Sequence, residues 1–142
     1  MAGGQAIDLE GVGQKIDLTA LKQMHAMKTG ALLSCAVRMG AIAAELDATA
    51  VNQLTQYSTA LGLAFQVVDD VLDATADSQT LGKTAGKDAA DDKPTYVTLM
   101  GLEYAQNQAK ELQALALDSL APLGPKADAL RALARLVVER TH

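Results

Sequence analysis

Apolar residues recur every three or four positions along most of this 142-residue chain, and that period restricts its fold more than any other feature. A step of three or four keeps one face of an α-helix in the core, whereas strands alternate with a period of two. Alanine and leucine, the best helix formers, number 27 and 21, and aromatic residues, which favour sheets, make up only 3%. The sequence therefore predicts an all-α protein, folded as one domain over residues 1–142.

The chain predicts four main helices, which cover residues 19–46, 49–75, 94–120 and 126–140. Thr19 suits the N-cap of the first helix. Pro94 suits the first turn of the third, because its missing N–H would be unpaired there anyway. Residues 1–9 carry no helix-start signal, and the two glycines within residues 10–17 indicate a loop.

Residues 76–94 form the only long stretch without a helical pattern, ADSQTLGKTAGKDAADDKP. Loops of this length are usually functional or disordered, and we expect this one to be partly disordered without ligand. It contains Lys83, Lys87 and Lys93 among glycines, but its four aspartates more than balance the three lysines. Taken alone, a solvated loop of mixed charge is therefore the more common interpretation.

Three aspartates, Asp69, Asp70 and Asp73, end the second expected helix, where their negative charge opposes the helix dipole. Asp69 and Asp73 share a helix face because they are four residues apart, and Gln66 precedes Asp69 by three. Carboxylates without histidine or thiolate suit Mg²⁺, which binds through one or two carboxylates plus substrate phosphates. The alternative is a solvated acidic patch, against which the apolar helix before and the lysine loop after both count.

Lys28 lies within the apolar stripe of the first expected helix, so it must snorkel to solvent, pair, or face a polar cavity. Snorkelling is the common outcome. The functional alternative is that Lys28 points at an anion between helices, with the Thr29 hydroxyl as a further donor. Together with the aspartates and the lysine loop, Lys28 would then enclose a Mg²⁺–diphosphate.

Two further residues have no part in this site: we expect His25 on the surface and Cys35 in the core.

The charge balance and the cysteine content exclude several classes of protein. A net charge of -5 and a pI near 4.8 argue against a nucleic-acid binder, which usually has a basic face. The single cysteine cannot form an internal disulfide, which favours a reducing compartment. No apolar run reaches the length of a membrane span, and no signal pattern begins the chain. We therefore expect a cytoplasmic protein without a membrane span.

Five short motifs follow one another, and they are Gly3-Gly4-Gln5-x-x-Asp8, Lys28-Thr29-Gly30, Phe65-Gln66-x-x-Asp69-Asp70-x-x-Asp73, Gly82-Lys83-x-x-Gly86-Lys87-Asp88 and Lys93-x-Thr95-Tyr96. This ordered set covers essentially the whole chain and resembles the trans-isoprenyl diphosphate synthases, most of all the bacterial farnesyl or geranyl diphosphate synthases. The resemblance implies a helical bundle of the isoprenoid synthase type. It also implies a Mg²⁺-dependent prenyltransferase of isoprenoid biosynthesis, which extends an allylic diphosphate (dimethylallyl or geranyl) with isopentenyl diphosphate.

The resemblance also implies roles for individual residues. The metal ligands would be the aspartates of the family's second aspartate-rich motif, Asp69, Asp70 and Asp73, with Asp69 the expected direct ligand. The catalytic residues that hold the leaving diphosphate would be Lys28, Thr29, Gln66 and Lys83, and Lys93 would be a further diphosphate ligand.

The family pattern contains an earlier aspartate-rich motif, followed by arginines, which also binds Mg²⁺ and isopentenyl diphosphate. This sequence has no such segment, and its arginines form no cluster; they are Arg38, Arg131, Arg135 and Arg140. The resemblance therefore implies the C-terminal half of such an enzyme, incomplete and inactive alone. The alternative is a non-catalytic helical partner or dimerisation module derived from one. A class I terpene cyclase is a further alternative, but the lysine loop and the few aromatics count against it.

Half of a bundle would expose the apolar faces that its missing helices cover. Exposed apolar patches of more than a few hundred Å² usually mark an interaction site. We therefore expect a homo-oligomer, or a complementing N-terminal half as partner.

Overall fold

The computed structural model describes residues 2–10, 16–75 and 94–140, and every element within these ranges is helical, which confirms the all-α expectation. The elements are α1 (Ala2–Glu10), α2 (Leu18–His25), the π-helical turn η1 (Ala26–Gly30), α3 (Ala31–Ala43), α4 (Ala48–Thr75), α6 (Tyr96–Met100), α7 (Leu102–Leu120), the 3₁₀ segment η2 (Ala121–Ala127) and α8 (Asp128–Glu139). The predicted partial disorder of residues 76–94 falls almost entirely outside the described residues.

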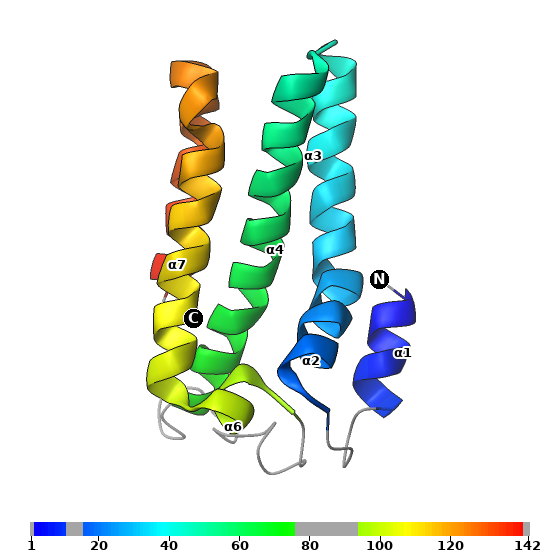
Figure 1. Ribbon diagram of the computed structural model, residues 1–142, viewed down its shortest axis with the longest axis vertical. Helices are drawn as coiled ribbons and strands as arrows, with labels where there is room; N and C mark the ends of the chain where they lie inside the picture. The colour runs from blue at the N-terminus through cyan, green and yellow to red at the C-terminus, as the bar shows by residue number, and fades with distance from the viewer. Residues whose placement is uncertain (1, 11–15, 76–93, 141–142) are drawn as a thin grey trace.

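The long helix α4 is the centre of the bundle and lies between α3 and α7 (Figure 1). One core cluster, around Tyr57 and Leu61, joins α4 to α3, α7 and α8. A second cluster, around Val67 and Tyr96, joins the other end of α4 to α2, α6 and α7. Figure 1 shows α1, α2 and α3 on one side of α4, and α7 on the other. The end of α4 that carries the predicted site is therefore packed from both sides.

The first predicted helix, 19–46, is interrupted in the structure. Asp17, not Thr19, is its N-cap, because Asp17 Oδ1 accepts the Ala20 N–H at 2.8 Å. The helix then widens at η1, where the Ala31 N–H reaches the carbonyl of Ala26, five residues back. A π-turn adds one residue to the helix and leaves the apolar pattern almost intact, so the spacing of apolar residues does not reveal it.

The third predicted helix is divided in the structure, and the fourth begins after a 3₁₀ segment. The predicted helix 94–120 is two helices, because Gly101 adopts φ +90° and ends α6 before α7 begins. Before α8, residues 121–127 form a 3₁₀ segment in which Gly124 has φ +62°. At the other end of the chain, residues 2–10 form α1, although the sequence has no helix-start signal there.

Two expectations about burial are wrong. Cys35 is exposed rather than in the core, because it lies on a face of α3 that nothing in the described structure covers. His25 is buried rather than on the surface, and its ring lies 5.8 Å from that of Tyr96. Helical periodicity identifies an apolar face, but it does not say which face another helix covers.

None of the described helices combines the length and apolar character needed to cross a membrane.

Candidate active site

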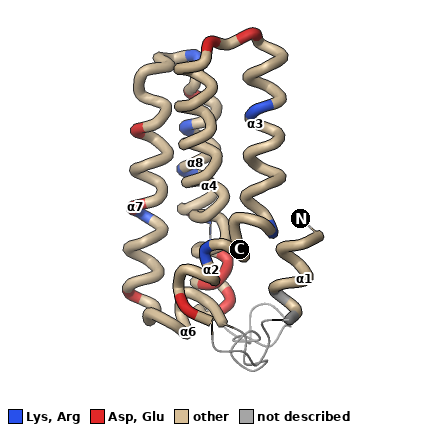
Figure 2. Tube along the Cα trace, turned by 45° about the vertical axis from the view of Figure 1, so that its right-hand side comes forward, with Lys and Arg blue, Asp and Glu red and all other residues tan. Residues whose placement is uncertain are grey.

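The lower end of α4 in Figure 2 carries a concentration of acidic residues, close to the C-terminal end of the chain. Asp69 is 44% exposed, and its Oδ2 accepts a hydrogen bond from Gln66 Nε2 at 3.2 Å. Gln66 itself is buried, so this bond fixes one oxygen of Asp69 against the helix. Asp73 lies one turn further along the same face and is partly buried. The predicted pairing of Gln66, Asp69 and Asp73 on one face therefore exists in the structure.

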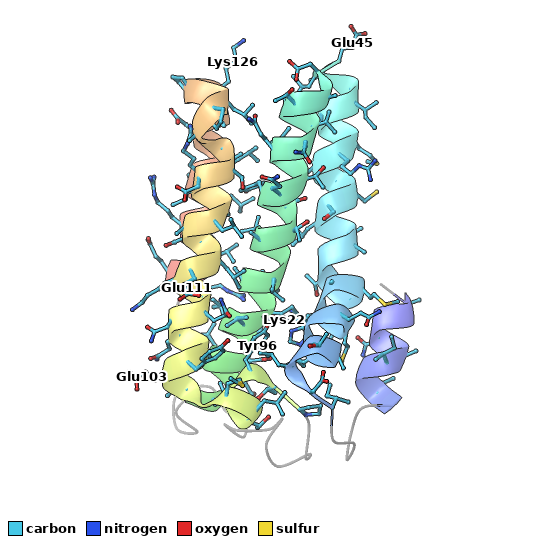
Figure 3. All side chains as sticks on the ribbon, viewed as in Figure 1. Lys22, Glu45, Tyr96, Glu103, Glu111 and Lys126 are labelled. Carbon is cyan, nitrogen blue, oxygen red and sulfur yellow. The ribbon has the colours of Figure 1, made fainter. Side chains whose placement is uncertain are left out.

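Asp70 points to a different partner. Its carboxylate is buried, and Oδ2 accepts the backbone N–H of Tyr96 at 2.8 Å. This bond joins the end of α4 to the first residue of α6, and Tyr96 lies at the lower end of the bundle (Figure 3). Burial, with the charge of Asp70 and the neighbouring Tyr104 as lesser causes, raises the pKa of the Tyr96 hydroxyl. That hydroxyl has no hydrogen-bond partner among the described residues.

The described residues fit magnesium only through two carboxylates. Across residues 2–10, 16–75 and 94–140, no three His, Cys, Asp or Glu side chains gather as a metal cluster. Asp69 and Asp73 nevertheless share a face and offer only oxygen, and Mg²⁺ commonly binds one or two carboxylates together with substrate phosphates. The donor set therefore fits Mg²⁺ with a phosphate ligand, while Asp70 as a third ligand stays a prediction.

Lys28 and Thr29 lie in η1 and are partly buried. Both line an apolar hollow of about 650 Å³, whose other walls come from α1, α3 and Phe65 of α4. Phe65 is the residue immediately before Gln66, so one segment of α4 both lines this hollow and begins the acidic face. A cation, a hydroxyl and an apolar hollow beside an acidic helix end are the features needed to bind an anion with an apolar tail.

Two glycines allow the neighbouring helices to reach the backbone of η1. A Cβ on Gly4 of α1 would lie 2.2 Å from the Lys28 backbone nitrogen, and a Cβ on Gly62 of α4 would lie 2.8 Å from Gly30 Cα. Figure 1 shows α1 and α4 on opposite sides of this segment. The π-turn that carries Lys28 is therefore held between two helices that approach to backbone contact. Single-turn π-helical segments are frequent at functional sites.

Arg140 is a site residue that sequence reasoning missed. It follows α8, pairs with Asp69 Oδ1, and lies over the Phe65 ring at 4.2 Å from the centroid. The sequence gives no sign of this contact, because 71 residues separate Arg140 from Asp69. Lys83 and Lys93, in contrast, were predicted from the sequence but lie outside the described residues.

Solved prenyl diphosphate synthases have the same fold. The chain aligns with an FPP/GFPP synthase from Zymomonas mobilis at a TM-score of 0.82 and 36% identity, covering 97% of this chain and 45% of that one. It aligns with a geranyltransferase from Helicobacter pylori, complexed with magnesium and isoprenyl diphosphate, at a TM-score of 0.78 and 33% identity, covering 98% and 46%. The bundle is therefore of the isoprenoid synthase class.

A model of the polyprenyl synthetase family matches residues 1–130, and the chain belongs to this family. A probable farnesyl diphosphate synthase of Sinorhizobium fredii is 53% identical over 133 residues, which are 91% of this chain and 40% of that protein. The farnesyl diphosphate synthase of Escherichia coli is 44% identical over 99% of this chain and 48% of its own length. The chain thus spans less than half the length of these curated relatives.

Proposed function

We propose that this chain is part of a prenyltransferase that joins an allylic diphosphate to isopentenyl diphosphate. One observation carries the proposal: Lys28 and Thr29 share an apolar hollow with Phe65, and the same segment of α4 continues into Gln66 and Asp69. An anion-binding group and an acidic, metal-competent face therefore flank one apolar space. Membership of the polyprenyl synthetase family supports the same activity.

The residues of the site would have two roles in the release of diphosphate: binding its oxygens and holding magnesium. The Lys28 ammonium and the Thr29 hydroxyl would bind diphosphate oxygens, and Asp69 and Asp73 would hold magnesium, with Asp70 as the third predicted ligand. Magnesium would neutralise the negative charge that develops on the leaving group. Gln66 orients Asp69 by its hydrogen bond. Lys83 and Lys93 stay predicted diphosphate ligands, since they rest on the sequence alone.

The hollow suits the prenyl chain. Its apolar lining residues are Ala2, Leu32, Leu33 and Phe65. An apolar, water-poor space protects a reactive carbocation from hydrolysis. The Phe65 ring lies at the boundary between this space and the acidic face, so the reacting carbon would lie beside it.

The second substrate requires residues that the described part of the chain does not contain. Within it there is neither a second carboxylate cluster nor a group of arginines for isopentenyl diphosphate. We therefore propose that a complementing N-terminal half completes the site, because a further copy in a homo-oligomer would supply only the same residues again. The cytoplasm as the place of action stays a prediction from the sequence.

A chimera tests this function. The remainder of the Sinorhizobium fredii relative is fused in front of this chain, and the incorporation of labelled isopentenyl diphosphate into prenyl products is measured. We expect the chimera to turn over, whereas the chain alone gives none. Lys28→Ala in the chimera should lower kcat by about 10²–10³-fold, the usual loss for one electrostatic stabiliser. Lys126→Ala is the control, because Lys126 lies at the far end of the bundle (Figure 3).

Three results would count against the proposal. Turnover by the chain alone at about 1 per second, a typical enzyme's rate, would show that no other chain completes the site. A folded but inactive chimera would favour the alternative of a non-catalytic helical module. A chimera that is active and insensitive to Lys28→Ala would remove Lys28 from the site.

A further inference from the structure

Arg140 reaches the acidic face of α4 from the other end of the sequence. Its Nη2 forms an ion pair with Asp69 Oδ1 and donates a hydrogen bond to the Phe65 carbonyl at 3.1 Å. Its guanidinium also lies 4.2 Å from the centroid of the Phe65 ring. One side chain thus contacts both the acidic face and a residue that lines the apolar hollow.

Asp69 compensates the charge of Arg140, which is the more buried of the two side chains. The Arg140 side chain is only 20% exposed, and Asp69 is 44% exposed. Removing a partly buried charge from water is costly unless an opposite charge compensates it. In the structure, Arg140 and Asp69 therefore neutralise each other's charge.

Both oxygens of Asp69 are engaged in this arrangement. Oδ1 accepts from Arg140, and Oδ2 accepts from Gln66 at 3.2 Å. A divalent cation bound at Oδ1 would lie beside the guanidinium, and the two like charges would repel each other at this short distance. The two cations therefore compete for the same oxygen.

The surroundings of Arg140 allow its side chain to leave. α8 ends at this residue, whose backbone turns to an extended conformation while its N–H still bonds the Leu136 carbonyl at 3.1 Å. The side chain can therefore move without unwinding α8. Arg140 also lines a hollow of about 320 Å³ between α4, α7 and α8, which gives it room. Its buried Nε has no hydrogen-bond partner among the described residues, so the Arg140 side chain leaves one donor unpaired while it contacts Asp69.

We propose that Arg140 is the counter-ion that holds Asp69 in the cation-free protein, and that its release from Oδ1 is a required step of divalent-cation binding. This inference rests on the proposed function, because it takes Asp69 to be a metal ligand. The same release removes the cation–π contact on Phe65, so cation binding alters one wall of the apolar hollow.

Titration of Mn²⁺ into the full chain by isothermal calorimetry, without diphosphate, tests the competition. Arg140→Gln should bind Mn²⁺ about tenfold more tightly than the wild type, the change expected when one competing charge-assisted hydrogen bond is lost. Arg140→Lys should tighten binding less, because lysine keeps the charge but lacks the planar guanidinium that contacts Asp69 Oδ1 and the Phe65 carbonyl together. Arg135→Gln is the matched control, since Arg135 is an exposed arginine of the same helix.

The outcomes separate this inference from the proposed function. Asp69→Asn should lose Mn²⁺ binding, and equal binding by Asp69→Asn and the wild type would overturn the metal site itself. If Asp69→Asn loses binding but Arg140→Gln binds no more tightly than the wild type, only the role of Arg140 is wrong. An equal gain in Arg140→Gln and Arg135→Gln would also overturn it, because net charge would then explain the effect.

Discussion

Neighbouring residues of identical type have different roles in this protein. Asp69 is half-exposed and meets Gln66 and Arg140, whereas Asp70 is buried and accepts the Tyr96 N–H. The sequence correctly predicts that these aspartates lie near the end of a helix, and their sharing of an oxygen-rich metal site stays a prediction. It could not show that Asp69 and Asp70 have different partners, because these partners lie 71 and 26 positions further along the chain.

Tyr57 makes the stability of the protein sensitive to alkaline pH. Its ring is fully buried, its hydroxyl donates to the Leu130 carbonyl at 3.0 Å, and burial raises its pKa from 10.0 to about 12. The unfolded chain therefore loses this proton first as the pH rises through 10, and the free energy of unfolding falls between pH 10 and about 12. Below pH 10 both states keep the proton, so this contribution is intact.

Tyr57→Phe should lose less stability than the wild type over that pH range, as measured by urea unfolding at successive pH values. Tyr96 remains in the variant and, with its raised pKa, continues to contribute in the same direction. Tyr104→Phe, at an exposed tyrosine, is the control for the loss of one hydroxyl; because Tyr104 is the least of the causes that raise the pKa of Tyr96, its pH profile should stay close to that of the wild type. Identical pH profiles for Tyr57→Phe and the wild type would contradict this account.

At the scale of elements, the sequence predicts where helices lie better than where they bend. The apolar period correctly predicts α4, because one unbroken helix buries one continuous stripe. It misses the π-turn η1 and the break at Gly101, because each changes the backbone without changing which residues are apolar. The π-turn matters most, because it carries Lys28 and Thr29.

Gly62→Ala should destabilise the protein, although alanine favours helices over glycine by about 1 kcal/mol. The new Cβ would lie 2.8 Å from Gly30 Cα, a backbone atom that cannot give way cheaply. Overpacking of this kind typically costs about 1–3 kcal/mol, so we expect a net loss in the free energy of unfolding in urea.

Two other glycines of the same bundle are matched controls. A Cβ on Gly40 would meet nothing within 4 Å, so Gly40→Ala should stabilise the protein by about 0.5–1 kcal/mol. Gly30→Ala should be tolerated, since its Cβ would meet only ordinary contacts at 3.8 Å and beyond. If Gly62→Ala stabilised the protein as much as Gly40→Ala, the close approach of α4 to η1 would be wrong.

The whole molecule presents an apolar surface that its described residues leave uncovered. Leu133 and Leu46 are exposed at the edge of a groove of about 460 Å³ between α3, α4 and α8. On α3, Met39 and Ile42 are also exposed. The sequence predicts such a surface only through the family resemblance, since periodicity does not reveal which helices are covered.

Assembly follows from this surface. We expect a dimer or larger species at low micromolar concentration in sedimentation velocity, because exposed apolar patches of this kind usually recruit a partner. A double variant, Met39→Glu with Leu133→Glu, should shift the distribution toward monomer without loss of helical circular dichroism. A sharp monomer peak for the unaltered chain would contradict the expectation.

The central claim is that this chain carries one wall of a prenyl diphosphate site, built from Lys28 on η1 and Asp69 on α4. The direct test is calorimetric titration of dimethylallyl diphosphate into the full chain, with and without Mg²⁺. We predict binding that requires Mg²⁺, disappears in Asp69→Asn and in Lys28→Met, and survives in Lys126→Met at the far end of the bundle. Binding that is equally strong without Mg²⁺, or that persists in both site variants, would contradict it.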